Sequence, residues 1–180
     1  DSAGNPATTI VRTVNVADTG APSIMVSGSN PLNHEINTTY TDQGASASDV
    51  VDGDLTSNII VGGETVNTST IGTYTISYNV VDSGSNAAPQ KTRTVNVGDF
   101  TAPVITSGAS TINVELGTSY ADAGATASDN YEGNITSSIV STGSVDAFTA
   151  NTYTIYYNVS DAAGNTAIQV QRTVIVGDSS

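Results

Sequence analysis

The sequence is short of the residue types that most catalytic and nucleic-acid-binding sites use. It contains no cysteine and no tryptophan, one histidine, and four basic residues against 17 acidic ones. Without cysteine, disulfides and thiol chemistry are excluded. The net charge of −13 would repel a phosphate backbone, so a nucleic-acid partner is not expected, whereas a cation is a natural partner for such a surface.

Long hydrophobic runs are absent as well. No stretch approaches the roughly 18 consecutive apolar residues of a membrane-spanning helix, and the sequence does not start with a basic segment followed by an apolar one. We therefore expect neither a membrane span nor a signal peptide, and we interpret the chain as an internal piece of a mature protein.

Catalytic motifs are equally scarce. His34 is the only histidine, and Thr38 stands where a zinc-binding His-Glu-x-x-His motif would need its second histidine. The many serines lack a matching base and are typical of turns and strand surfaces. The sequence therefore predicts a protein that is not an enzyme.

What the sequence does contain is an internal repeat with a period of about 80 residues. The segment Gly44–Asp49 (GASASD) recurs as Gly124–Asp129 (GATASD), and Thr73–Tyr78 (TYTISY) recurs as Thr152–Tyr157 (TYTIYY). Because two full copies fit into the chain, the repeat predicts two similar domains in series.

The closing segment of the repeat occurs once more than the rest. The motif Arg-Thr-Val-x-Val begins at Arg12, at Arg93 and at Arg172, each time a few residues before an aspartate. The first occurrence has no complete copy ahead of it. The predicted division is therefore the final strand of a preceding repeat in residues 1–18, one domain in 19–99 and another in 100–180.

Apolar residues alternate within each copy, as expected for half-buried strands. In the first copy, Tyr74, Ile76, Tyr78 and Val80 share one face of a strand, with polar residues between them. About seven short strands fit into each copy, which is the number in an immunoglobulin-like sandwich, and Tyr74 resembles the tyrosine corner at the start of strand F. The predicted fold class is all-β, as tandem immunoglobulin-like β-sandwich domains.

Several motifs together resemble the bacterial immunoglobulin-like tandem repeats related to hyalin repeats. They are an Ala-Pro pair at each domain start, the loop Asp52-Gly-Asp54-Leu-Thr56, the Tyr-x-Ile-x-Tyr strand and the turn Asp161-Ala-Ala-Gly-Asn165. The resemblance spans nearly the whole chain. It implies an extracellular or cell-surface location, because that family occurs in surface adhesins, in secreted hydrolases as accessory modules, and in one class of pesticidal crystal protein. It implies function less closely, because function depends on sites rather than on fold.

Acidic loops at one end of each predicted sandwich form candidate metal sites. In an immunoglobulin topology the B–C and F–G loops lie at the end where the chain enters from the preceding domain. Calcium takes several hard oxygen ligands from flexible loops, so Asp and Asn side chains gathered there would suit Ca²⁺. The candidate ligands at the first joint are Asp18, Asp49, Asp52, Asp54, Asp82 and Asn86. Those at the second joint are Asp99, Asp129, Glu132, Asn134, Asp161 and Asn165, with Glu35 and Asp42 contributed by the first domain.

The same acidic residues also have a purely structural interpretation. Asp and Asn in such loops form Asx turns, and Asp49 and Asp129 can instead pair with Arg93 and Arg172. Arg12, Arg93 and Arg172 occupy one repeat position, which indicates a structural role with an acidic partner. The sequence leaves both interpretations of the loops open.

These observations lead us to expect a non-catalytic structural or adhesive spacer array of an extracellular bacterial surface or filament protein, its joints stiffened by calcium. The alternative is a carbohydrate-binding or accessory module of a secreted hydrolase, with Tyr131, Phe148 and Phe100 as a candidate glycan-stacking surface. Expected partners are neighbouring repeats of the same chain and a glycan or a cell-surface protein. Residues 1–18 either fray or add as a strand to another copy of the chain.

Overall fold

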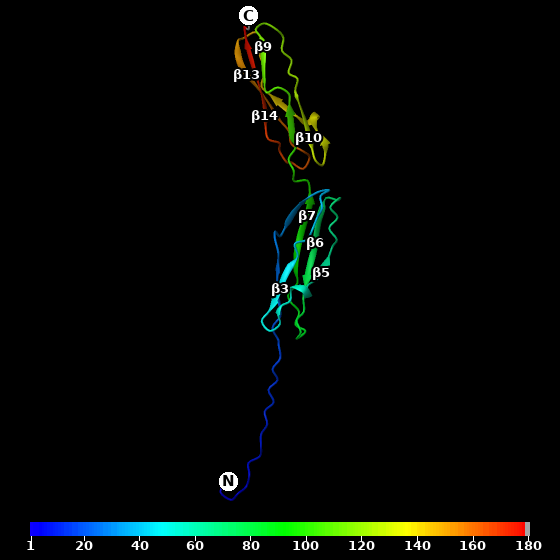
Figure 1. Ribbon diagram of the computed structural model, residues 1–180, viewed down its shortest axis with the longest axis vertical. Helices are drawn as coiled ribbons and strands as arrows, with labels where there is room; N and C mark the ends of the chain where they lie inside the picture. The colour runs from blue at the N-terminus through cyan, green and yellow to red at the C-terminus, as the bar shows by residue number, and fades with distance from the viewer. Residues whose placement is uncertain (179–180) are drawn as a thin grey trace. The chain divides into compact units, whose positions relative to one another are not determined.

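The computed structural model describes residues 1–178, and in it the chain forms two compact units. Unit 1 consists of Asp1–Asn30, Asp42–Thr65 and Thr75–Thr94, and unit 2 of Pro31–Thr41, Val66–Tyr74 and the chain from Val95 onward. Strands dominate both units (Figure 1). The division of the chain by its sequence repeat, at residues 19 and 100, stays a prediction.

Residues of the first repeat form one three-stranded and one four-stranded sheet, with the orders β1–β3–β4 and β2–β7–β6–β5. The strands are β1 (Ser23–Val26), β2 (Leu32–Glu35), β3 (Ala45–Asp49), β4 (Gly53–Asp54), β5 (Ile60–Gly63), β6 (Gly72–Asn79) and β7 (Lys91–Gly98). A single 3-10 turn, η1 (Thr56–Asn58), follows β4. Strand β2 runs parallel to β7, whereas β1 and β3 are antiparallel.

The second repeat has the same two sheets, with the orders β8–β10–β11 and β9–β14–β13–β12. The elements are β8 (Val104–Ser107), β9 (Thr111–Glu115), β10 (Ala125–Asp129), β11 (Gly133–Asn134), η2 (Thr136–Ser138), β12 (Val140–Thr142), β13 (Asn151–Asn158) and β14 (Val170–Gly177). Here too the final strand β14 is parallel to β9 and antiparallel to β13. The prediction of all-β, immunoglobulin-like sandwiches is confirmed.

The hydrophobic core of the second repeat lies between its two sheets. Ile105 of β8 and Ala127 of β10 belong to the same buried cluster as Tyr157 of β13 and Val174 of β14. These residues face inward because alternate side chains of a strand point to opposite faces. The corresponding buried residues of the first repeat are Ile24, Ala47, Tyr78 and Val95.

The predicted tyrosine corner is present in both repeats. The hydroxyl of Tyr74 donates a hydrogen bond to the carbonyl oxygen of Thr70 at 3.1 Å, and Tyr153 donates to the carbonyl of Thr149 at the same distance. Each bond reaches back four residues, across the turn that leads into the strand. The corner therefore fixes where β6 and β13 begin.

A buried arginine sits at the centre of each sandwich. Arg93 is 0% exposed and Arg172 2% exposed. The Nε of Arg93 lies 3.0 Å from a carboxylate oxygen of Asp42, and Arg172 forms an ion pair with Asp122. The hydroxyl of Tyr157 donates to Asp122 at 2.7 Å, so that each charge has partners, as burial requires.

These ion pairs decide one of the alternatives that the sequence left open. The prediction that the repeated arginines are structural and pair with an acid is confirmed for Arg93 and Arg172. Their partners are Asp42 and Asp122, rather than Asp49 and Asp129. Those two loop aspartates accept hydrogen bonds from backbone amides instead.

Residues 6–22 contain neither helix nor strand, although a strand is predicted around Val14 and Val16 (blue trace, Figure 1). Val14 is 69% exposed and Val16 94% exposed. A strand needs hydrogen-bonding partners along at least one edge, and none of the strand pairings among residues 1–178 involves this segment. The local sequence of residues 6–22 does not by itself provide these hydrogen-bonding partners.

Candidate metal centres

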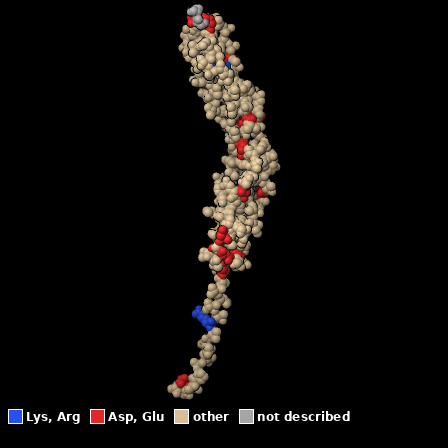
Figure 2. All heavy atoms as spheres, viewed as in Figure 1, with Lys and Arg blue, Asp and Glu red and all other residues tan. Residues whose placement is uncertain are grey.

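Aspartates from distant parts of the sequence meet in two clusters. The first contains Asp18, Asp49, Asp52 and Asp82, and the second contains Asp99, Asp129 and Asp161. Within each cluster, one oxygen from every residue lies within 4.8 Å of the others. Figure 2 shows the wider setting, in which acidic side chains gather in patches and basic ones are few on the face in view.

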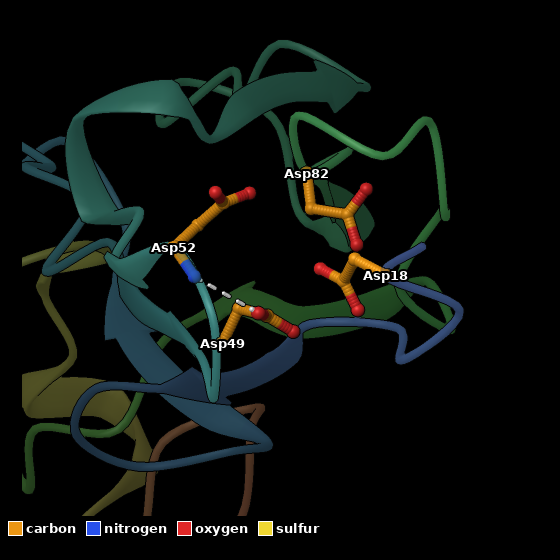
Figure 3. Close-up of side chains that lie close together, drawn as sticks. All are labelled: Asp18, Asp49, Asp52 and Asp82. Atoms are coloured by element: carbon orange, nitrogen blue, oxygen red, sulfur yellow. Dashed lines mark hydrogen bonds between the residues drawn. The ribbon is translucent and has the colours of Figure 1, made fainter. Parts of the chain in front are cut away.

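The first cluster lies within unit 1 and takes its residues from three parts of the chain. Asp18 precedes β1, Asp49 is the last residue of β3, Asp52 lies in the loop between β3 and β4, and Asp82 lies in the loop after β6. Figure 3 shows the four carboxylates directed toward a common space. Like charges at this separation repel each other unless protons or a cation neutralise them.

Backbone amides hold two of these carboxylates in place. Asp49 Oδ1 accepts hydrogen bonds from the amides of Val51 at 2.7 Å and Asp52 at 3.1 Å, forming an Asx turn. These bonds, that from Val51 above all, lower the pKa of Asp49 below its ordinary value. Asp52 in turn accepts from the amide and hydroxyl of Ser83 at 2.7 and 2.8 Å, which ties the two loops together.

An asparagine connects the loop after β6 to the chain ahead of the repeat. Asn86 donates its amide N–H to Asp82 Oδ1 at 2.7 Å and its side-chain nitrogen to Asp82 Oδ2 at 2.9 Å. The same nitrogen lies 3.2 Å from the carbonyl oxygen of Asp18 and donates to it. Asn86 therefore positions both Asp82 and the backbone of Asp18 beside the cluster.

The second cluster, within unit 2, repeats this geometry. Asp129 Oδ1 accepts from the amides of Tyr131 and Glu132 at 2.7 and 3.0 Å. Asn165 donates to both carboxylate oxygens of Asp161 at 2.7 Å and to the carbonyl of Asp99 at 3.3 Å. Because two differing loop sequences reach one arrangement, the fold itself sets the positions of the carboxylates.

Three carboxylate oxygens in the clusters are buried and have no hydrogen-bond partner. They are the Oδ2 atoms of Asp18, Asp99 and Asp129. Asp99 is only 7% exposed and Asp129 8% exposed. An unpaired buried carboxylate oxygen is costly, and a bound cation is one way to offset that cost.

The charges around Asp99 would also favour a bound cation. Burial raises the pKa of Asp99 above its ordinary value, a hydrogen bond from the amide of Thr101 lowers it in part, and repulsion from Asp129, Asp161 and Glu35 raises it further. Its ionised form is therefore less favourable than that of an exposed aspartate. A cation placed among these carboxylates would reverse that preference.

Glu35, at the end of β2, reaches the second cluster from the first repeat. Its Oε2 accepts from the amide of Phe100 at 2.9 Å and its Oε1 from the side chain of Asn130 at 2.9 Å. Burial alone would raise the pKa of Glu35, but these two hydrogen bonds bring it below its ordinary value. Glu35 thus lies beside the cluster as an ionised group held by its neighbours.

The structure places three other predicted ligands elsewhere. Asp42 pairs with the buried Arg93, and its carboxylate also accepts from the hydroxyl of Tyr78 at 2.8 Å. Asp54 and Asn134 accept from the amides of Thr56 and Thr136, at 2.9 and 3.0 Å, and so stabilise the start of a 3-10 turn. Their side chains are used for folding rather than for the clusters.

Glu132 is not one of the three aspartates of the second cluster, but it connects two loops beside it. Its Oε1 accepts from the amide of Ala162 at 2.9 Å, as Asp52 accepts from Ser83 in the first cluster. It therefore ties the loop after β10 to the loop after β13. The sequence did not identify Asn130 as a partner of Glu35, although Asn130 occupies the position of Val50 and so marks a difference between the repeats.

Of the aromatic residues predicted for glycan stacking, Phe100 and Tyr131 have local packing contacts and Phe148 is exposed. Phe100 packs on Gly98, where an added Cβ would lie 3.2 Å from the ring. Tyr131 lines a shallow apolar hollow together with Ile71 and Ala162. Phe148 is 74% exposed. Glycan binding by these residues stays a prediction.

The fold and the repeated loop geometry define a tandem array of immunoglobulin-like β-sandwiches. The family model for the bacterial surface protein, Ig-like domain, matches residues 24–97 and again residues 105–176. Together these matches span most of the chain, and the chain belongs to this family. Within residues 1–178, no helix is both long and apolar enough to cross a membrane.

This chain is similar to parts of longer proteins. The pesticidal crystal protein Cry22Aa of Bacillus thuringiensis is 32% identical over 148 residues, which cover 79% of this chain and 20% of that protein. A solved structure from Clostridium perfringens ZmpB, containing the M60 catalytic domain with two CBM51 domains, matches with a TM-score of 0.52 and 15% identity. That match covers 92% of this chain and 31% of that chain, and it shows similarity of fold alone.

Proposed function

We propose that this chain is a non-catalytic segment of an extracellular array of Ig-like repeats in a bacterial surface protein. It serves as a spacer or adhesive stalk, and Ca²⁺ binds where one repeat passes into the next. Membership of a bacterial surface Ig-like family supports the structural role and the location. The buried, unpaired oxygens of Asp18, Asp99 and Asp129 are the observation that supports the metal.

The surroundings of the single histidine support a non-catalytic role. His34 Nε2 lies 3.2 Å from the hydroxyl of Thr38, a pairing that could in principle activate a nucleophile. The Thr38 hydroxyl, however, donates its proton to the carbonyl of Glu35 at 2.6 Å. The imidazole is therefore not placed to remove that proton.

The donor set suits calcium better than other biological cations. The ligand atoms of both clusters are hard carboxylate oxygens of aspartates, which favours Ca²⁺ or Mg²⁺ over softer metals. Two oxygens on opposite sides of a Ca²⁺ ion are about 4.6–5.2 Å apart, given Ca–O distances near 2.3–2.6 Å. Because the oxygens of each cluster lie within 4.8 Å of one another, a single ion could contact all of them. Loops of irregular geometry also suit calcium, because magnesium demands a near-octahedral shell.

In this proposal the residues of the clusters act as a clamp on the chain between repeats. Asp18 and Asp99 lie at the ends of linker segments, and the other ligands come from two loops of the repeat that follows. An ion held by all of them would join the linker to those loops. The linker would then have fewer accessible conformations, and the spacer would be stiffer.

Calcium-dependent thermal unfolding tests the proposal. The full chain, first freed of metal with a chelator and then titrated with Ca²⁺, should unfold at a midpoint several degrees higher. Binding to the folded state alone stabilises by about 2.7 kcal/mol when free ligand is 100 times Kd. Asp49→Asn and Asp129→Asn should each reduce the shift and remove one bound calcium per chain in equilibrium dialysis.

Asp54→Asn is the matched control, since it makes the same charge change on β4, a few residues from Asp49 but outside the cluster. The second repeat carries Asn134 at this position with the same hydrogen bond to the following turn, so the variant should fold normally. It should keep the full calcium shift. If Asp54→Asn and Asp49→Asn reduced the calcium-induced rise in the unfolding midpoint equally, or if the unmodified chain bound no calcium, the proposal would be refuted.

A further inference from the structure

The carboxylate of Glu35 connects two segments of unit 2 that each carry a ligand of the second cluster. Glu35 is the last residue of β2, and its Oε2 accepts a hydrogen bond from the amide of Phe100 at 2.9 Å. Its Oε1 accepts from the side-chain nitrogen of Asn130, also at 2.9 Å. Phe100 directly follows Asp99, and Asn130 directly follows Asp129. One carboxylate therefore holds the residues next to two candidate ligands.

Each of these two ligands is also oriented from within its own segment. Asp99 Oδ1 accepts a hydrogen bond from the amide of Thr101 at 3.2 Å, and Asp129 Oδ1 accepts from the amide of Tyr131 at 2.7 Å. These bonds leave the Oδ2 atom of each aspartate buried and without a hydrogen-bond partner. Glu35 thus joins two short segments, each of which keeps one carboxylate oxygen available to an ion.

The first repeat carries a different residue at the position of Asn130. Val50 follows Asp49 in the first cluster as Asn130 follows Asp129 in the second. Val50 is 100% exposed, and its side chain has no hydrogen-bond donor. It therefore cannot form the bond that Asn130 makes, and the chain itself supplies a natural comparison for the bridge through Glu35.

Such a bridge affects metal binding because an ion binds more tightly to ligands that are already held in place. Segments that must be ordered when the ion arrives lose conformational entropy at that moment. Glu35 also places a further negative charge beside Asp99 and Asp129, and these charges repel one another in the metal-free chain. A cation would offset that repulsion, so the bridge and the ion stabilise each other.

We propose, on the basis of the calcium binding proposed above, that Glu35 is the positioning residue of the second metal centre. It acts through Asn130 and the amide of Phe100 rather than as a ligand of the ion. Both of its oxygens already accept hydrogen bonds, and it is not among the residues of the second cluster. The calcium affinity of this cluster then depends on two side chains that do not contact the ion.

The calcium affinity of the full chain, measured by titration calorimetry, tests this inference. With Asp49→Asn present in every protein, the second site is measured alone. Asn130→Val, which introduces the residue found at position 50, should raise the Kd of that site about 10- to 100-fold, as is usual when a residue that orients a ligand is lost. Glu35→Gln should raise it at least as much. With Asp129→Asn present instead, Asn130→Val should leave the Kd of the first site unchanged.

Further measurements separate positioning from a general structural role. A purely structural role would lower the unfolding midpoint of the metal-free chain without changing the calcium affinity of the folded chain. Asn130→Gln keeps a side-chain amide donor and should recover part of the affinity lost in Asn130→Val. When Glu35→Gln and Asn130→Val are combined, Kd should rise by less than the product of the two single effects, because both residues act through one contact.

Glu115→Gln is the matched control for Glu35→Gln. Glu115 ends β9 as Glu35 ends β2, and it pairs with Gly177 of the final strand as Glu35 pairs with Gly98. It belongs to neither cluster, so the substitution should change the Kd of neither site.

Two results would show that Glu35 is not a positioning residue. If Glu35→Gln weakens the second site and Asn130→Val does not, Glu35 acts as a ligand or through its charge alone. If neither change alters the Kd in a chain that binds two calcium ions, the bridge has no part in binding, although the proposed function stands. A chain that binds no calcium at all would instead overturn both the proposed function and the role of Glu35.

Discussion

At the scale of single residues, the buried ion pair of each sandwich gives the protein a defined alkaline limit. Burial, the hydrogen bond to Asp122 and the charge of Asp122 together raise the pKa of Tyr157 from 10.0 to about 12. Because folding raises the pKa of this tyrosine, its neutral form contributes fully to stability at every pH below the pKa that it has in the unfolded chain. That stabilisation is lost as the pH rises from 10 toward 12.

We therefore expect Tyr157→Phe to remove part of the fall in stability between pH 10 and 12, while lowering stability at pH 8 because Asp122 loses a hydrogen-bond donor. Denaturant-induced unfolding at a series of pH values measures both effects. Tyr156→Phe, one residue away and 37% exposed, is the control and should behave as the unmodified chain does. An unchanged slope in Tyr157→Phe above pH 10 would contradict this assignment.

The sequence predicted the role of the arginines but not their partners. Arg93 and Arg172 recur at one repeat position, so a structural role with an acid was predictable. Asp42 and Asp122 lie about 50 residues earlier in the sequence, whereas the partners considered from the sequence were Asp49 and Asp129. Only the packing of the sheets determines which carboxylate is close enough.

At the scale of secondary-structure elements, one glycine in each repeat ends an edge strand. Gly63 and Gly143 have φ angles of +87° and +101°, and a Cβ added to them would lie 2.4 and 2.3 Å from the carbonyl oxygens of Thr75 and Thr154. Both the backbone angle and the space require glycine here.

Gly143→Ala should thus destabilise the chain by about 2–4 kcal/mol, since it adds a backbone clash to the usual cost of a positive φ angle. Gly117→Ala is the graded control, because Gly117 has a φ of +83° but nothing within 4 Å of an added Cβ. It should cost about 1 kcal/mol. Equal effects of the two substitutions on the thermal midpoint would disprove the role of the close contact.

Alternation of apolar residues predicted the long strands well, because burial on one face requires a period of two. It did not predict the short 3-10 turns η1 and η2, which depend on Asp54 and Asn134 as local hydrogen-bond acceptors. It also predicted a strand at Val14 and Val16, where no partner strand is present. An alternating pattern shows that a segment can form a strand, but whether it does so depends on a neighbouring strand along at least one edge.

At the scale of the whole molecule, the proposed calcium binding would depend on pH through the acidic clusters. The pKa of Asp99 is raised in the folded, metal-free chain, mainly by burial. Its protonated form therefore stabilises the fold at low pH, and this contribution is lost as the pH rises through the raised pKa. At neutral pH a bound cation would replace the missing proton.

We expect the rise in thermal midpoint caused by Ca²⁺ to be largest near pH 7 and to shrink as the pH falls toward 4, because protons and calcium compete for the same oxygens. Differential scanning calorimetry with and without calcium at each pH measures this. Asp129→Asn should reduce the effect at neutral pH most. A calcium shift of equal size at pH 4 and pH 7 would contradict competition at the clusters.

The turn at Asp1–Asn5 has a consequence for how such repeats fold. It closes through bonds between residues four apart, so little chain entropy is lost in forming it. A turn that forms by itself would set the register of the strands on either side before they pair. Register matters because a slip of one residue would turn every valine of the final strand outward. Each repeat would thus bring its own starting point for folding.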